Sequence, residues 1–206
     1  MTNKLEINDL ECIRNEKSIF QNLTFKVESS QTILITGKNG SGKTSLLRII
    51  AGFIVNYKGE ILFNSKKIND FNKLIADFKF VGQKNSLKEN LTVQQNIELW
   101  QYLYQTTIDI DQITGPLNIK SFLDKDVSSL SDGQRKRVSL SRLTISQSKV
   151  WLLDEPLVYL DADKVKLLGS LIDKHNKDGG MTIYSSNTKN NLDYNKLINM
   201  DDYALL

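Results

Sequence analysis

A glycine-rich loop that ends in a lysine and a threonine occupies residues 37–44, with the sequence GKNGSGKT. The spacing G-x-x-x-x-G-K-[ST] is typical of a phosphate-binding loop between a strand and a helix. Its glycines let successive amide groups turn toward a phosphate, and the helix N-terminus adds its positive end. We expect Lys43 to reach the β- and γ-phosphates of a nucleoside triphosphate and Thr44 to bind Mg²⁺. The other residues expected to bind the nucleotide here are Gly37, Lys38, Asn39, Gly40, Ser41, Gly42 and Ser45.

Two acidic residues follow an apolar run later in the chain, in VWLLDEP at 150–156. The run predicts a buried strand, and carboxylates at a strand's carboxyl end face the ligand crevice of an open α/β sheet. We expect Asp154 to hold Mg²⁺ through water and Glu155 to polarise the water that attacks the γ-phosphate. A helix cap or a solvated pair is the alternative for these acids, and the phosphate loop disfavours it.

Strand patterns dominate the first part of the chain and return at its end. Helical spacing follows the phosphate loop, at Leu46, Leu47, Ile50 and Ala51, and recurs around 163–177. Uninterrupted apolar strands followed by helices indicate a parallel sheet that is covered on both faces. The predicted strands are 4–13, 23–28, 32–36, 60–63, 78–82, 150–153, 181–185 and a short one near 196–200.

The segment from about 84 to 148 lacks strand patterns and predicts a helical lobe. GQRKRVSLSRLTISQ, at 133–147, has the pattern of an amphipathic helix. We expect Trp100 and Tyr104 to lie in the core of the lobe, and a partner-docking face is the alternative for them. The residues that recur at helical intervals before this helix are Val93, Ile97, Trp100 and Tyr104.

A small polar stretch, LSDGQ at 130–134, stands at the start of that helix. Ser131 can donate a hydroxyl hydrogen bond, Gly133 exposes its amide group, and the helix N-terminus favours an anion. The stretch therefore suits a phosphate. It also suits simple capping of the helix by Ser131 or Asp132, and the two interpretations are compatible.

The order of these motifs resembles the ATP-binding-cassette (ABC) ATPases, with LSDGQ between the phosphate loop and the acids and Gln83 at a strand end. The resemblance covers nearly the whole chain. It implies an α/β P-loop NTPase fold of the ABC ATPase type, with a mixed core sheet, an antiparallel β subdomain and a helical lobe. It further implies one domain, with a RecA-like core at about 1–83 and 149–206 and a helical subdomain at about 84–148. ATP and Mg²⁺ are the cofactors that it implies.

The same resemblance implies a head-to-tail homodimer, in which each LSDGQ covers the nucleotide held by the other molecule. It assigns Gln83 to the metal and the attacking water, and Asp161 to a loop that crosses to the partner. Taken singly, Gln83 and Asp161 are more often surface polar residues. The residues that it assigns to the partner's nucleotide are Ser131, Gly133 and Gln134.

Within the family, the chain most resembles the haem exporter ATPases of cytochrome c maturation, through LTFKVESSQTILITGKNGSGKTSLLRIIAG, VWLLDEPLVYLD and GGMTIYSSN. In that group a separate membrane-spanning subunit accompanies the ATPase, and ATP turnover drives release of a haem-carrying chaperone. The resemblance implies a peripheral location on the cytoplasmic face of the inner membrane. For an organelle-encoded chain it implies the matrix face of the mitochondrial inner membrane.

Two residues depart from the family pattern. Asn187 stands where a histidine usually contacts the γ-phosphate, so we expect Asn187 to be the third catalytic residue and hydrolysis to be slower. The reason is that asparagine can donate a hydrogen bond but cannot carry a positive charge near neutral pH. Asp132 replaces the more frequent glycine of the signature, and its charge is expected to point outward or to approach the metal. The one histidine, His175, is expected to be solvated on a helix.

Composition limits the other functions. The 27 basic and 24 acidic residues give a net charge of +3 and are interspersed, so no nucleic-acid partner is expected. No window of about 18 uncharged apolar residues predicts a membrane span, and the N-terminus lacks the apolar core of a signal peptide. We therefore expect a soluble chain that reaches a membrane only through another subunit. The single cysteine, Cys12, is expected to be a buried thiol.

Two alternatives to an exporter ATPase stay open. The first is a soluble cassette ATPase acting on nucleic acid or ribosomes. Against it, the chain has one cassette rather than two, and too few residues separate Lys43 from LSDGQ for the coiled-coil insertion that a DNA-repair relative would normally show. A module that clamps on ATP and hardly hydrolyses it is favoured by Asn187 and Asp132. The presence of Glu155 argues against that second alternative.

Overall fold

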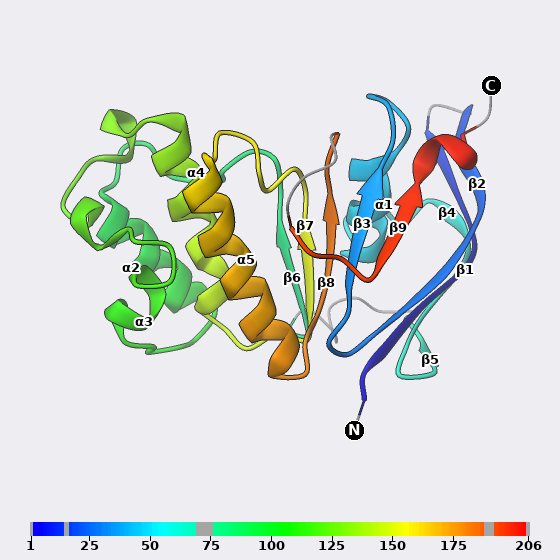
Figure 1. The fold of residues 1–206 in the computed structure, drawn as a ribbon, viewed down its shortest axis with the longest axis horizontal. Coiled ribbons are helices and arrows are strands. Elements are labelled where there is room, and N and C mark those ends of the chain that lie inside the picture. The colour runs from blue at the N-terminus through cyan, green and yellow to red at the C-terminus, as the bar shows by residue number, and fades with distance from the viewer. Residues whose placement is uncertain (1, 15–16, 69–75, 188–191, 205–206) are drawn as a thin grey trace.

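The computed structural model describes residues 2–14, 17–68, 76–187 and 192–204. Two sheets and a group of helices make up this part of the chain (Figure 1). The antiparallel sheet has the strand order β2-β1-β4-β5, with β1 at Lys4–Arg14, β2 at Lys17–Glu28, β4 at Tyr57–Phe63 and β5 at Lys66–Lys67. The core sheet has the order β6-β7-β8-β3-β9, with β3 at Thr32–Thr36, β6 at Phe78–Val81, β7 at Val150–Leu153, β8 at Met181–Ser185 and β9 at Lys196–Asn199.

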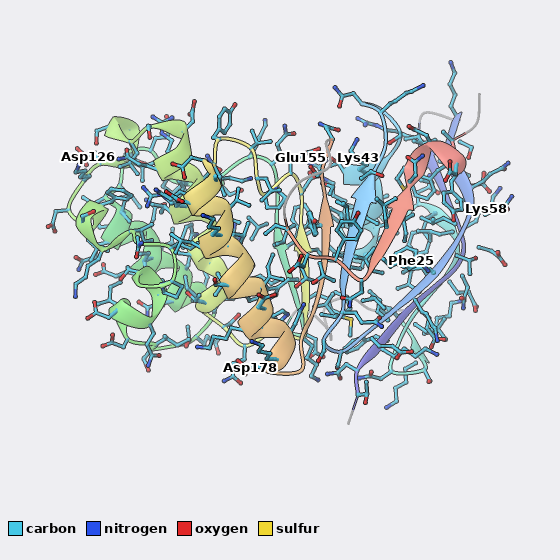
Figure 2. The ribbon with its side chains drawn as sticks, viewed as in Figure 1. Phe25, Lys43, Lys58, Asp126, Glu155 and Asp178 are labelled. Carbon is cyan, nitrogen blue, oxygen red and sulfur yellow. The ribbon has the colours of Figure 1, made fainter. Side chains whose placement is uncertain are left out.

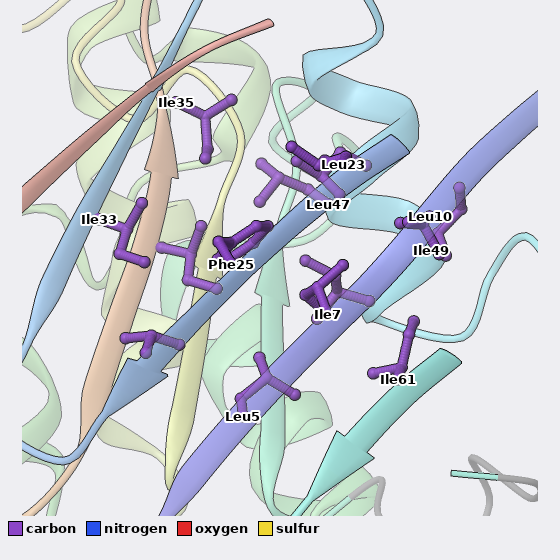
Figure 3. Close-up of a cluster of buried hydrophobic side chains, with 14 of the residues drawn as sticks. Leu5, Ile7, Leu10, Leu23, Phe25, Ile33, Ile35, Leu47, Ile49 and Ile61 are labelled. Atoms are coloured by element: carbon purple, nitrogen blue, oxygen red, sulfur yellow. The ribbon is translucent and has the colours of Figure 1, made fainter. Parts of the chain in front are cut away.

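The core sheet is parallel in every pairing between its described strands. The sequence of β7, VWLL, is apolar and buried at every position because both faces of this sheet are covered. Ile33 and Ile35 of β3 belong to a cluster that also contains residues of α1 (Lys43–Ile50) and the antiparallel sheet (Figure 3). Leu34 points to the other face and joins the cluster of α5 (Ala162–Lys177) and the helical lobe. All the strands therefore end at one edge, where residues that follow them can meet.

The second strand of the antiparallel sheet, β2, begins earlier in the chain than the sequence predicted. β2 starts at Lys17 rather than at residue 23, because residues 17–20 pair with the end of β1. Phe20 lies opposite Cys12, and both side chains are buried, as the sequence predicted for the cysteine. Alternate residues of β1, such as Leu5 and Ile7, point into the shared core.

The helical lobe contains α2 (Val93–Leu103), α3 (Ile110–Thr114) and α4 (Asp132–Leu140), and it lies on the opposite side of the core sheet from α1 (Figure 1). Trp100 is buried as expected, whereas Tyr104 is 36% exposed. The predicted helix at 133–147 is α-helical only as far as Leu140 and continues as a tighter 3₁₀ turn, in which the hydroxyl of Ser141 donates to the backbone carbonyl of Val138. Short 3₁₀ turns lie at η2 (Lys120–Phe122), η3 (Val127–Ser129), η4 (Ser141–Thr144) and η5 (Met200–Asp202).

The predicted α/β P-loop layout, with an antiparallel subdomain and a helical lobe, is confirmed. It differs in one detail, since the described strands of the core sheet are parallel rather than mixed. The division into a core at about 1–83 and 149–206 and a subdomain at about 84–148 stays a prediction. The expectation for His175 is wrong: its ring is half-buried and stacks on Trp151, with the ring centroids 3.8 Å apart.

Candidate active site

The glycine-rich loop joins β3 to α1 at the carboxyl edge of the core sheet (Figure 1). Gly42 stands directly before α1 with a φ of 97°, a conformation that favours glycine. A Cβ atom at this position would also lie 2.7 Å from Cδ1 of Phe20. The loop therefore needs glycine here to turn into the helix. Asp201 fixes the other end of the loop, because its Oδ1 accepts a 2.9 Å hydrogen bond from the amide of Lys38.

The side chain of Lys43 folds back over this loop. Its Nζ donates to the carbonyl of Gly37 at 2.6 Å and to that of Lys38 at 3.0 Å, and only 7% of the residue is exposed. No side chain caps the N-terminus of α1, and the buried hydroxyl of Ser41 has no hydrogen-bond partner among the described residues. A lysine, free helix amides and an orphaned hydroxyl together suit an anion such as a phosphate.

The Thr44 hydroxyl and the Asp154 carboxylate meet at this edge although they come from distant parts of the chain. Oγ1 of Thr44 lies 3.0 Å from each carboxylate oxygen of Asp154. Asp154 follows β7, is 2% exposed, and also accepts a 2.8 Å hydrogen bond from the hydroxyl of Ser185. A buried carboxylate beside a hydroxyl is the hard oxygen donor set that Mg²⁺ prefers, so these two residues fit the expected metal.

Glu155 lies at the same edge of the sheet as Lys43 (Figure 2). It is 8% exposed, and its amide donates a 2.9 Å hydrogen bond to the Ser185 hydroxyl. Burial raises the pKa of Glu155, while the backbone amide of Asn187 and the charge of Lys43 act in the opposite direction. A carboxylate with a raised pKa is a stronger base, which suits a residue that polarises water.

Asn187 and Gln83 both follow core strands, after β8 and β6 respectively. Asn187 is exposed, and its contact with Glu155 is made by its backbone amide. Gln83 is also exposed. Their predicted catalytic roles, and the metal contact expected of Gln83, therefore stay predictions.

The LSDGQ stretch forms a reciprocal cap at the start of α4. The Ser131 hydroxyl accepts from the amide of Gln134, and the Gln134 side-chain oxygen accepts a 2.9 Å hydrogen bond from the amide of Ser131. Ser131 and Asp132 are exposed, so the Asp132 carboxylate points outward, in agreement with one of the two expectations for it. α4 and α1 lie on opposite sides of the core sheet (Figure 1), so one molecule does not bring this stretch onto its own phosphate loop.

Sequence reasoning missed two residues of this site. Ser185 joins both acids through one hydroxyl, and the small polar pair Ser185-Ser186 at the end of a buried strand was the available signal. Lys136, on α4, is 1% exposed and is a charged neighbour of Asp154 and Glu155. The run of three consecutive basic residues in GQRKRV gives no indication of that burial.

No helix in the described ranges is both long and apolar enough to cross a membrane.

Comparison with known proteins agrees with this geometry. Residues 20–158 match the model of the ABC transporter family. A cytochrome c biogenesis ATP-binding export protein CcmA, from Wolbachia pipientis wMel, is 40% identical over 185 residues that cover 89% of each chain. The protein of the same name from Vibrio cholerae is 36% identical, over 88% of this chain and 90% of its own. A solved ABC transporter ATP-binding protein of Pyrococcus furiosus has a TM-score of 0.85 at 27% identity, over 98% of this chain and 100% of its own.

Proposed function

This chain belongs to the ABC transporter family, and from that premise we propose that it is the ATP-hydrolysing subunit of an exporter that serves cytochrome c biogenesis. The observation that carries the ATPase part is the contact of Thr44 with Asp154 beside a phosphate loop with an unpaired hydroxyl. The names of relatives that match most of the chain support the biological role.

In the proposed binding step, the triphosphate lies along residues 37–45. The Lys43 ammonium group leaves the carbonyls of Gly37 and Lys38 and binds the β- and γ-phosphates, while the amides at the start of α1 bind the remaining oxygens. Thr44 and Asp154 would hold Mg²⁺, with Gln83 as a further ligand. When bound, the metal supplies charge neutralisation of the phosphate oxygens.

In the proposed hydrolytic step, Glu155 accepts a proton from the water that attacks the γ-phosphate in line. Burial raises the pKa of Glu155 and so strengthens it as a base. Ser185 holds the Glu155 backbone next to Asp154, which fixes the position of the base relative to the metal ligand. Asn187 would donate to the phosphate in place of the more frequent histidine.

A homodimer completes the site in this proposal. Ser131, Gly133 and Gln134 of one molecule would cover the nucleotide of the other, because the exposed start of α4 lies away from its own loop. Asp161, also exposed, would belong to the loop that crosses to the partner. A separate membrane-spanning subunit would carry the transport path and hold the dimer at the membrane, on the cytoplasmic or the matrix face. Haem, with its chaperone, is the cargo system that the resemblance favours.

The nucleotide-driven dimer is tested with Glu155→Gln, which keeps the side-chain shape and removes the base. With Mg-ATP, we expect this variant to run as a dimer in light scattering and to lose nearly all hydrolysis, and without nucleotide to run as a monomer. Glu155→Gln combined with Lys43→Ala should stay monomeric under both conditions. A Glu155→Gln chain that remains monomeric in excess Mg-ATP contradicts the proposed dimer.

The biological role is tested in a bacterial strain that lacks its own related ATPase. Expression of this chain with its membrane partner should restore covalently bound haem c, measured by absorbance of the reduced pyridine complex. The Glu155→Gln variant serves as the matched control, because it should bind ATP without turnover. Restored ATPase activity without haem c would reject the cytochrome c role and leave the ATPase proposal standing.

A further inference from the structure

Lys136 is a buried cation that the proposed chemistry does not use. It lies on α4, two residues after the LSDGQ stretch, and only 1% of it is exposed. Its ammonium group forms no hydrogen bond or ion pair that involves another described residue. Burying a charge without a close partner is unfavourable, so the presence of a lysine here calls for a reason.

The packing of α4 shows which segment this part of the helix meets. A Cβ atom on Gly133 would lie 2.7 Å from the carbonyl oxygen of Tyr159, so this side of α4 is pressed against the segment that follows the acids. Residues three apart lie on the same face of a helix. Lys136 therefore lies near the side of α4 that packs against the segment following Asp154 and Glu155.

The electrostatics agree with that direction. Burial lowers the pKa of Lys136 to about 8, and the opposing influences come from Asp154 and Glu155. Lys136 in turn acts to lower the pKa of Glu155. These two buried carboxylates are neighbours in the chain, so their negative charges repel in a site of low dielectric. The positive charge of Lys136 offsets part of that repulsion.

We propose, resting on the ATPase function proposed above, that Lys136 is a positioning residue whose buried ammonium charge holds the Asp154–Glu155 pair in its working arrangement. Because the same helix begins with Ser131 and Gly133, Lys136 also connects the acids of its own site to the surface offered to the second molecule. A residue kept only for packing would act through its aliphatic stem, and methionine would replace it.

The first test is a double-mutant cycle on the melting temperature, without nucleotide or metal. It compares Lys136→Met in the natural chain and in the Glu155→Gln background. We expect the change in melting temperature caused by Lys136→Met to be about 3 °C more favourable in the Glu155→Gln background than in the natural chain, because Glu155 is then uncharged. The control background is Asp163→Asn, an exposed carboxylate on α5 paired with Lys166, where no such difference should occur. Equal effects in the two main backgrounds overturn the proposal.

The second test is steady-state hydrolysis. Lys136→Met should lower kcat about tenfold and leave KM for ATP within twofold, since Lys136 is not part of the phosphate loop. Lys136→Arg should recover at least half of the lost rate, because it restores the charge. Equal losses in both variants, or a loss confined to KM, overturn the proposal. A natural chain that hydrolyses no ATP would instead contradict the proposed function, and the melting cycle would still decide the interaction of Lys136 with Glu155.

Discussion

The Ser185 hydroxyl, at the end of β8, donates a 2.8 Å hydrogen bond to the carboxylate of Asp154, which directly follows the neighbouring strand β7. The same oxygen accepts the Glu155 amide at 2.9 Å. One small side chain therefore sets the position of the expected metal ligand and, through the backbone, that of the expected base.

Ser185→Ala should both destabilise the protein and slow hydrolysis. The change leaves a buried amide without a partner and removes a hydrogen bond to a charged group, a loss of about 1–3 kcal/mol in the free energy of unfolding. We expect kcat to fall on the order of tenfold. Urea unfolding and ATPase assays measure the two effects. Ser139→Ala is the matched control, because the Ser139 hydroxyl is buried with no partner among the described residues. Similar losses in both variants would show that the Ser185 hydrogen bonds do not matter.

Gly133→Ala should disturb the contact of α4 with the segment after the acids. The new Cβ would lie 2.7 Å from a backbone carbonyl, so α4 must shift, at a cost of about 1–3 kcal/mol in stability. Light scattering of the variant in the Glu155→Gln background should show weaker ATP-driven dimerisation. In Gly169→Ala the Cβ meets only the tip of the flexible Leu192 side chain, so that control should dimerise normally.

Asn187→His should raise turnover, because an imidazole can carry a proton near the γ-phosphate and an amide cannot. The exposed Asn187 side chain leaves room for the larger ring, and its backbone contact with Glu155 does not depend on the side chain. We expect a gain in kcat on the order of tenfold. Unchanged turnover together with intact nucleotide binding would contradict this explanation of slow hydrolysis.

Lys79 gives the protein a stability that rises with pH. Burial, and then the charge of Arg142, lower the pKa of Lys79 to about 7, whereas a lysine in an unfolded chain has a pKa of about 10.4. Between these values the unfolded chain binds a proton that the folded chain does not, so the free energy of unfolding increases from pH 7 upward. Relative to Lys79→Met, the free energy of unfolding of the natural chain should rise by up to about 1.4 kcal/mol for each pH unit in this range. Urea unfolding of both proteins at pH 7, 8 and 9 measures it, and parallel curves would exclude the lowered pKa.

Local patterns predicted much of the fold and the chemistry of the site, because apolar periodicity and glycine spacing are properties of short segments. The strand at 150–153 and the helix around 163–177 were found in this way, as was the phosphate loop. Contacts between distant segments were harder to predict from the sequence. Nothing in the spacing shows that the ring of His175 stacks on Trp151, or that Lys136 is buried and has the two acids as charged neighbours. The sequence pattern also did not show that α4 would give way to a 3₁₀ turn after Leu140.

The backbone of Glu155 has a φ of 48°, in the left-handed region. Side chains branched at Cβ are strongly disfavoured there, whereas glycine, asparagine and aspartate enter it readily. The backbone conformation therefore limits the residues that can replace Glu155 to a few without a branch at Cβ. A degenerate homologue that keeps its shape should carry Gly, Asn, Asp or Gln at this position, and one with Val, Ile or Thr should have lost the local fold together with its activity.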